Sequence, residues 1–195
     1  WDQKSYAGAP TLVCGATSAM LLWNFGAAIF RDGREFAPAV HIAPVTPPFS
    51  AVFDGTDYVI ANNNYGTKLE RRNERGDLVS EIRSDLDVQA LGFNGRELLL
   101  AGRDRENRFV ARRLDTAFRQ VGPDVLLADR EYAWGPAVAA SGRMWMIAWV
   151  GPGTVPRTMR LDLSGQLLDP IGGVVTGPPA PWVKLSWSGE AFEML

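Results

Sequence analysis

One short phrase that returns four times along the chain limits the folds that the chain can adopt. It consists of an apolar run, a small residue, a glycine, two further residues and a second apolar run. The glycines of the four copies are spaced by 40, 47 and 47 residues: Gly55, Gly95, Gly142 and Gly189. Asp-Gly, Asn-Gly and Ser-Gly pairs make tight turns because glycine reaches positive φ angles at little steric cost. We therefore expect each copy to be a β-hairpin.

A second turn follows three of these hairpins and completes the repeat. It is clearest in residues 72–78 and 161–168, and residues 114–119 hold the same place without a glycine. Two hairpins in a repeat of 40 to 47 residues give four short strands, which is the size of one propeller blade. The sequence thus predicts an all-β fold, a β-propeller of four-stranded antiparallel blades. A sandwich or a β-solenoid with coincidental spacing is the alternative.

The repeat also predicts where the blades begin and end within a single domain of residues 1–195. The expected blades are residues 11–48, 49–87, 88–135 and 136–181, followed by a partial fifth blade, residues 182–195 together with 1–10. In the first copy Thr17 stands where the turn glycine is expected. Four blades and a remnant make either a closed five-bladed ring or part of a larger propeller. The chain begins at Trp1 without a signal peptide, so we expect it to be a piece of a longer polypeptide.

The charge balance argues against nucleic-acid and membrane partners. The formal net charge is −2, from 22 acidic and 20 basic residues, so no overall field attracts nucleic acid or anionic lipid. The arginine-rich residues 103–113 are interleaved with acids, which predicts ion pairs on a solvated hairpin. No apolar run reaches the length of a transmembrane helix. We expect no nucleic-acid partner and no membrane insertion, and the sequence does not set the oligomeric state.

Residues suited to metal binding or nucleophilic chemistry are scarce. His41 is the only histidine and Cys14 the only cysteine, so no intrachain disulfide and no thiolate metal cluster can form. Cys14 lies in an apolar stretch, which predicts a small buried side chain. His41 lies in an expected outer strand or its exit loop, where a structural role is the simpler interpretation. We predict no cofactor and no metal, and we assign no catalytic residue.

Two aspartates are the remaining acids of interest. Asp85 and Asp87 come just before the expected innermost strand of the third blade. Glycosidases act through paired carboxylates, but no second acid stands at the equivalent place in the other innermost strands. A solvated loop is the alternative for both residues. Asp87 is kept as a candidate ligand-binding residue.

Two tryptophans are the other candidate ligand-binding residues. Trp134 and Trp182 lie on or just before expected innermost strands, beside Gly135, Pro136 and Pro181. An indole exposed in such a loop can stack on a sugar or hold a peptide. Packing between blades is the alternative for both, and it is the expected role of the large residues at the ends of the first strands, Phe53, Phe93 and Trp187.

Two segments carry a resemblance to a known group of proteins. Residues 52–60 and 160–170 are similar to the repeat of bacterial secreted and cell-surface β-propeller proteins, which reads approximately apolar-Ala-Trp-Asn/Asp-Gly-x-x-Tyr-Leu-Val. The resemblance implies export, with an extracellular, cell-surface or periplasmic location, and a non-catalytic role in adhesion or recognition. The chain lacks the Trp-Asp dipeptide of WD-repeat proteins and the Ser-x-Asp-x-Gly-x-Thr-Trp boxes of sialidases.

Three functions are therefore open. The first is a non-catalytic binding module whose blade loops hold a carbohydrate or a protein. The second is a glycoside hydrolase in which Asp87 lines the channel, and the third is a purely structural repeat segment. Whether the protein is an enzyme is left open, with a non-catalytic role preferred.

Overall fold

The computed structural model describes residues 11–23, 26–31, 34–40, 50–62, 67–129 and 133–195. His41 and residues 1–10 lie outside these ranges, so their predicted roles stay predictions. The chain divides into two compact units, residues 1–83 and 84–195, which we call the N-terminal and the C-terminal unit. Each is described by itself. The predicted single domain also stays a prediction.

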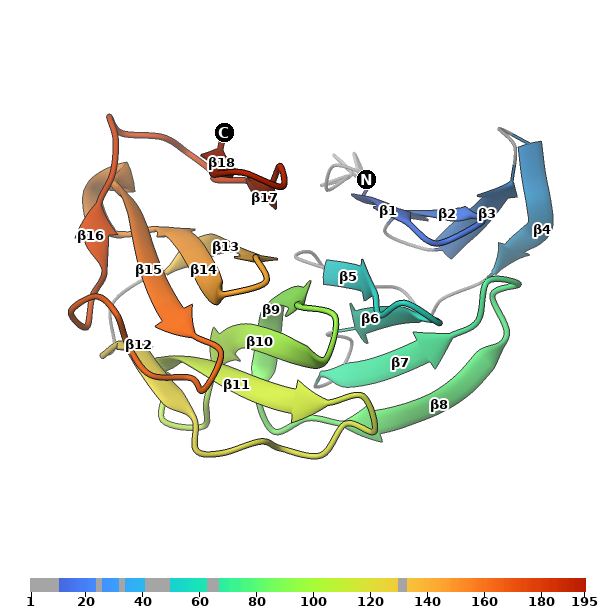
Figure 1. The fold of residues 1–195 in the computed structure, drawn as a ribbon, viewed down its shortest axis with the longest axis horizontal. Coiled ribbons are helices and arrows are strands. Elements are labelled where there is room, and N and C mark those ends of the chain that lie inside the picture. Colours follow the sequence, from blue (N-terminus) through green and yellow to red (C-terminus); the bar gives the residue numbers. More distant parts are fainter. Residues whose placement is uncertain (1–10, 24–25, 32–33, 41–49, 63–66, 130–132) are drawn as a thin grey trace, which may run out of the picture. The chain divides into compact units, whose positions relative to one another are not determined.

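The N-terminal unit contains two four-stranded sheets, in which each strand pairs antiparallel with the next strand of the sequence. The first sheet consists of β1 (Thr11–Cys14), β2 (Ala19–Trp23), β3 (Gly26–Arg31) and β4 (Arg34–Val40). The second consists of β5 (Ser50–Phe53), β6 (Tyr58–Asn62), β7 (Lys68–Arg72) and β8 (Leu78–Arg83). In Figure 1 they run from blue to green.

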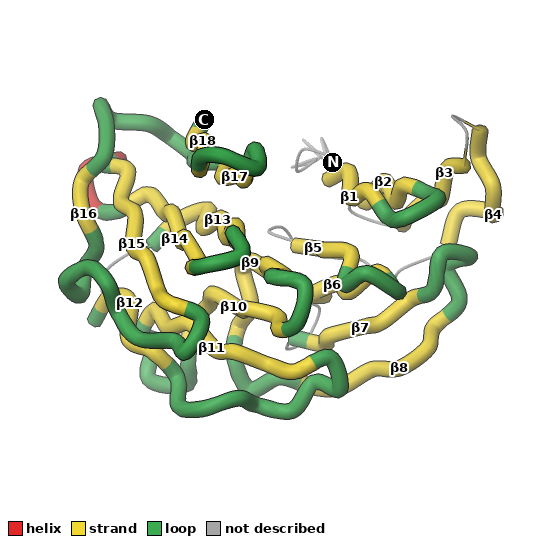
Figure 2. Tube along the Cα trace, in the orientation of Figure 1, coloured by secondary structure: helices red, strands yellow, loops and turns green. Residues whose placement is uncertain are grey.

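The C-terminal unit repeats this arrangement twice and adds a hairpin. The third sheet consists of β9 (Asp87–Phe93), β10 (Glu97–Arg103), β11 (Phe109–Asp115) and β12 (Val125–Ala128). The fourth consists of β13 (Trp134–Ala140), β14 (Met144–Val150), β15 (Pro156–Asp162) and β16 (Val174–Val175). The hairpin pairs β17 (Leu185–Trp187) with β18 (Phe192–Met194). Short turns join the strands, and the described helix is a single 3₁₀ turn, Pro152–Thr154 (Figure 2).

The predicted class, all-β with four four-stranded antiparallel blades and a partial fifth, is confirmed. In two sheets the first strand begins at a residue that the repeat assigned to the preceding blade. Asp87, predicted to end the second blade, is the first residue of β9. Trp134 falls inside the predicted third blade, residues 88–135, but it is the first residue of β13 in the fourth sheet.

The first copy of the repeat differs from its predicted alignment by one residue. The amide of Gly15 donates to the carbonyl of Ser18 at 2.7 Å and closes the turn between β1 and β2. This hydrogen bond places Ala16, rather than Thr17, at the position of the turn glycine. With Thr17 at that position residues 20–23 would align with residues 58–61, whereas the observed turn aligns residues 19–22 with them.

Two further expectations about single residues are corrected. Cys14 is exposed rather than buried, because side chains alternate along β1 and Val13 is the residue that points inward. Gly142 adopts no positive φ, although the equivalent residues Gly55, Gly95 and Gly189 do, at 91°, 92° and 103°. The Ser-Gly turn of the fourth sheet therefore has another backbone conformation.

Strand β14 shows how alternation builds the core of the C-terminal unit. Trp145, Ile147 and Trp149 point to one side, where they join the cluster shared with the third sheet. Ala148 and Val150 point to the other side and pack against the hairpin. A strand that is buried on both faces reads as an apolar run, which is why residues 144–150 carry no charge.

Candidate ligand-binding site

The first strands of the sheets in the C-terminal unit all begin at one end of the unit. In a sheet of four antiparallel strands, the fourth strand ends where the first began. The chain then leads from Ala128 to Trp134, and from Val175 to Leu185, so the next first strand begins at that same end. Strands β9, β13 and β17 contact one another in this order (Figure 1).

The three candidate residues of the sequence stand at this end, together with an arginine. Asp87 begins β9, Trp134 begins β13, and Trp182 precedes β17. Arg103, the last residue of β10, pairs with Asp87 in the ladder between β9 and β10. We call these four residues the tryptophan rim.

Trp134 is held outward by a β-bulge. It lies opposite Val150, but Ala137 lies opposite Ala148, so two residues of β13 face one residue of β14. The bulge contains Gly135, whose φ of 52° lies in the left-handed region. Bulges redirect side chains and often accompany functional sites. The Trp134 side chain is 56% exposed, an unusual environment for the largest apolar residue.

Trp182 is fixed by the residues on both sides of it. The amide of Ala180 donates to the carbonyl of Thr154 at 2.8 Å, which ties the preceding segment to the turn between β14 and β15. Val183 is buried against Ala148 and Val150. Trp182 itself is 54% exposed.

Val150 links the two tryptophans in space. It is the ladder partner of Trp134, and Val183, the neighbour of Trp182, packs against it. One buried valine is therefore the ladder partner of Trp134 and the packing partner of the residue that follows Trp182.

The polar end of the rim is also tied to Trp134. Arg103 donates to the carbonyl of Ala133, the residue before Trp134, at 3.4 Å, and to the carbonyl of Asn107 at 3.1 Å. The Gln89 amide reaches the Asp87 carboxylate at 3.4 Å. Gln89 is itself the extra residue of a bulge in β9. A guanidinium thus lies beside the residue before Trp134, and its ladder partner Asp87 adds a carboxylate at the same end of the sheet.

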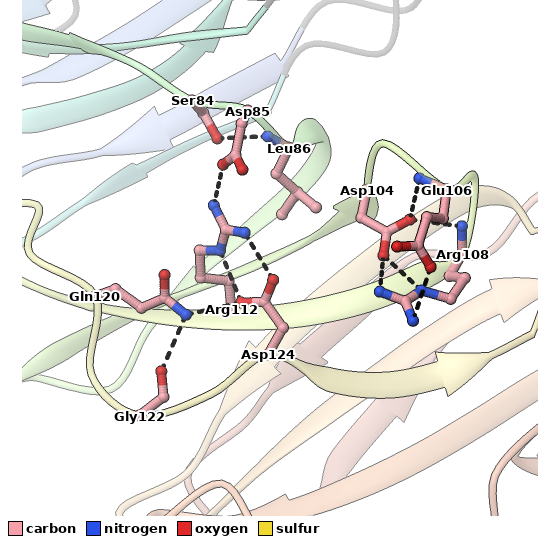
Figure 3. Close-up of polar contacts among 10 residues, drawn as sticks. All are labelled: Ser84, Asp85, Leu86, Asp104, Glu106, Arg108, Arg112, Gln120, Gly122 and Asp124. Carbon is pink, nitrogen blue, oxygen red and sulfur yellow. Dashed lines mark hydrogen bonds and ion pairs between the residues drawn. The ribbon is translucent and has the colours of Figure 1, made fainter.

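Asp85 is engaged elsewhere, in an ion-pair network that Figure 3 shows. Arg112 on β11 forms ion pairs with Asp85 and with Asp124, the latter at 2.6 Å. Gln120 donates to Asp124 at 3.0 Å and to the carbonyl of Gly122 at 3.0 Å. The hydrogen bond from Arg112 holds the pKa of Asp85 below its ordinary value. A general acid needs a raised pKa, so Asp85 is unsuited to that role.

The turn between β10 and β11 lies at the same end as the tryptophan rim, and both of its acids pair with Arg108. Asp104 accepts hydrogen bonds from the amides of Glu106 and Arg108, both at 2.9 Å. The Arg108 guanidinium contacts Asp104 at 2.7 Å and Glu106 at 3.0 Å (Figure 3). The arginine-rich segment therefore forms local ion pairs here, as its interleaved acids had indicated.

The described residues contain neither a metal-binding cluster nor a membrane-spanning helix. No group of three or more histidine, cysteine, aspartate or glutamate side chains there is arranged to hold a metal ion. In the same part of the chain, no helix combines the length and the apolarity that crossing a membrane requires.

Sequence reasoning found three members of the tryptophan rim and missed Arg103 and Gln89. Arg103 stands in an arginine-rich run in which nothing distinguishes it from its neighbours. The bulge at Gln89 is set by the register between β9 and β10, which the one-dimensional pattern does not contain. The ligand-binding role of Trp134, Trp182 and Asp87 stays a prediction.

No protein-family model matches the sequence, and no match was found among curated proteins. Solved structures are similar in fold. The Neurospora crassa Pan2 WD40 domain has a TM-score of 0.64 at 12% identity, over 90% of this chain and 54% of that one. The SapL1 lectin, solved with α-methyl fucoside, has a TM-score of 0.64 at 9% identity, over 95% and 71%. A Bacteroides caccae protein of unknown function has a TM-score of 0.56 at 15% identity, over 85% and 61%.

These similarities show the fold and nothing finer. WD40 domains are β-propellers, so the fold that the repeat predicted is confirmed. The chain spans about half the length of the Pan2 domain and about three fifths of the Bacteroides caccae protein.

Proposed function

We propose that this chain is a non-catalytic binding module of an exported bacterial protein, and that its tryptophan rim recognises a carbohydrate. The observation that carries the proposal is the pair of exposed tryptophans, Trp134 at 56% and Trp182 at 54%, at the start of β13 and just before β17. Tryptophan buries a large area at a modest loss of side-chain freedom, and it is enriched where binding energy is concentrated.

The groups around the indoles favour a sugar over a protein partner. Stacking on an indole uses the apolar face of a sugar ring, while the ring hydroxyls need hydrogen-bond acceptors and donors. Arg103 supplies donors beside Ala133, the residue before Trp134, and its ladder partner Asp87 supplies acceptors. The lectin that resembles this chain in fold was solved with a methyl glycoside, which supports the carbohydrate reading.

The non-catalytic part of the proposal rests on the acids of the same region. Asp85 is paired with Arg112, and Asp104 with Arg108. Asp87 contacts Gln89 rather than another carboxylate. Hydrolysis of a glycoside needs two carboxyl groups across the scissile bond, and among the described residues Asp85, Asp87 and Asp104 form no such pair.

Binding to an array of immobilised glycans tests the proposal. The wild-type chain should give saturable signals, and the double variant Trp134→Ala/Trp182→Ala should lose them while its circular dichroism spectrum and melting temperature are kept. Trp187→Ala is the matched control, because Trp187 is 37% exposed and lies at the opposite end of β17.

Other outcomes separate the remaining functions. Release of sugar from a bound glycan, abolished by Asp87→Asn, would replace the proposal with a hydrolase. Binding that survives in the double variant would place the site elsewhere. Absence of any glycan signal would leave a protein partner or a structural role.

Export is proposed on the repeat resemblance of residues 52–60 and 160–170. Expression of the full-length gene in a bacterial host, followed by protease treatment of intact cells, tests it. Digestion of the protein at the cell surface, or its recovery from the medium or periplasm, is the expected result. Recovery only with the cytoplasm would contradict it.

A further inference from the structure

We propose that the Asn94-Gly95 turn between β9 and β10 is a modification site, at which Asn94 deamidates in the folded chain and the turn accommodates the aspartate that forms. This modification does not depend on ligand binding at the tryptophan rim. Asn94 is the only one of the seven asparagines that glycine follows. Glycine has no side chain to shield its backbone nitrogen, so the peptide bond after Asn94 is the most open to attack by that route.

The reaction uses atoms that are neighbours along the chain. The backbone nitrogen of Gly95 attacks the side-chain carbonyl carbon of Asn94. The side-chain amino group leaves as ammonia, and the proton of the Gly95 amide passes to it by way of solvent. Water then opens the cyclic succinimide at one of its two carbonyls, which gives aspartate or isoaspartate at position 94. No electrons are transferred, and water is the only co-reactant.

The hydrogen bonds of the turn suit this attack. The side-chain oxygen of Asn94 accepts from the amides of Arg96 at 2.9 Å and Glu97 at 2.7 Å. These two donors stabilise the negative charge that develops on the oxygen as the carbonyl carbon is attacked. Within the described part of the chain, neither the Gly95 amide nor the side-chain nitrogen of Asn94 donates a hydrogen bond, and Gly95 is exposed. The nucleophile and the leaving group are therefore both accessible.

The second sheet shows the structure that an aspartate product would adopt. Asp54 holds the equivalent place, and its side-chain oxygen accepts from the amides of Thr56 at 3.0 Å and Asp57 at 2.8 Å. The φ of Gly55 is 91°, which matches the 92° of Gly95. An aspartate at position 94 can therefore accept the same two hydrogen bonds, and its charge strengthens them.

The third sheet also holds an arginine where the second sheet uses one. Arg71 forms an ion pair with Asp54 at 2.9 Å, and it lies opposite the fifth residue after Asp54 in the ladder. Arg113 lies opposite the fifth residue after Asn94, so it occupies the same place. The fold thus accommodates aspartate, whereas isoaspartate adds a carbon to the main chain and has no counterpart among these turns.

Mass spectrometry tests the proposal on the full chain. Wild type and Asn94→Ser are kept folded in mildly alkaline buffer, where more of the Gly95 amide is deprotonated, and are then digested with trypsin. Serine fills the equivalent place in the fourth sheet, where Ser141 accepts hydrogen bonds from the same turn, so this variant keeps the turn and has no amide to lose. The tryptic peptide of residues 84–96 should gain the mass difference between an amide and an acid in wild type only.

Two results would overturn the proposal. The first is an unchanged wild-type peptide from the folded chain over a period in which the same peptide converts in urea, because the turn would then protect Asn94. The second concerns the product, which the variant Asn94→Asp reproduces. Its melting temperature should equal or exceed that of Asn94→Ser, and a lower value would show that the turn does not accommodate the carboxylate.

Discussion

The two ends of the sheets in the C-terminal unit use their side chains differently. At the end with the Gly-containing turns, the side chain of the first turn residue accepts hydrogen bonds from backbone amides of the same turn. Asn94 accepts hydrogen bonds from the amides of Arg96 and Glu97 at 2.9 and 2.7 Å, and Ser141 accepts from Met144 at 3.1 Å. At the other end, the tryptophan rim presents two indoles outward.

The difference separates the residues that form the turns from the residues that are proposed to bind a ligand. The turn end carries the repeat, because a tight turn depends on a few residues at fixed positions. The rim end carries residues that lie outside the repeated phrase, and β9 and β13 each contain a bulge near it. Substitutions at the turn end should therefore change stability, and those at the rim should change binding.

The largest change in stability is expected where the third and fourth sheets meet. A Cβ added at Gly92 would collide with the side chain of Val138 and would lie 3.4 Å from the ring of Trp145. Gly92→Ala should lower the free energy of unfolding by about 1–3 kcal/mol, the usual range for overpacking. Gly142→Ala is the control, since a Cβ there meets nothing within 4 Å. Chemical denaturation of the two variants should separate them, and equal losses would contradict the packing account.

A glycine-to-alanine substitution at each end of the sheets tests whether stability and binding are affected separately. Gly95 has a φ of 92° and Gly135 a φ of 52°, so alanine strains the backbone at both, by roughly 1–2 kcal/mol. Both variants should melt at a lower temperature than the wild type. Only Gly135→Ala should also weaken glycan binding, because only its bulge positions Trp134. Weakened binding in Gly95→Ala, measured by calorimetry below its melting temperature, would contradict the separation of the two ends.

A smaller effect concerns the acid stability of the third sheet. The pKa of Asp85 is lowered in the folded chain by its hydrogen bond from Arg112. The pair therefore stabilises the folded state fully above about pH 4, the unfolded pKa, and loses this contribution as the pH falls through the folded pKa. Arg112→Met should remove that loss on acidification. Asp85 is 47% exposed, so solvent screening limits the effect to about 1 kcal/mol or less.

Urea unfolding at several pH values measures this dependence. Arg143→Met is a suitable control, because Arg143 lies exposed in the turn before β14 and forms no part of the Arg112 network. A profile of Arg112→Met that follows the wild type below pH 4 would show that the pair contributes nothing to acid stability.

Much of the fold could be predicted because short repeated segments of the sequence determine its turns. The turns at Gly55, Gly95 and Gly189 have the positive φ that the residue pairs indicated. The first copy was misaligned because Ala16 makes its turn without a positive φ, so the glycine signal is absent there. Phe118 shows the reverse case, since it takes a φ of 62° where the repeat has lost its glycine.

The site could be predicted only in part, for a physical reason. Tryptophans beside proline and glycine at the start of first strands are visible in the sequence, and Trp134 and Trp182 are indeed exposed. The packing of Val183 on Val150 and the contact from Arg103 to Ala133 depend on how sheets pack. Packing between sheets joins residues far apart in the sequence, and the repeat carries no signal for it.

The most direct test of recognition at the tryptophan rim is a titration followed by the indole N–H signals in ¹H–¹⁵N spectra. The chain has seven tryptophans, which single substitutions assign. Adding the glycan that gives the strongest signal on the array should shift the signals of Trp134 and Trp182 and leave those of Trp145, Trp149 and Trp187 in place. Shifts confined to Trp187, or to none of the seven, would contradict the account.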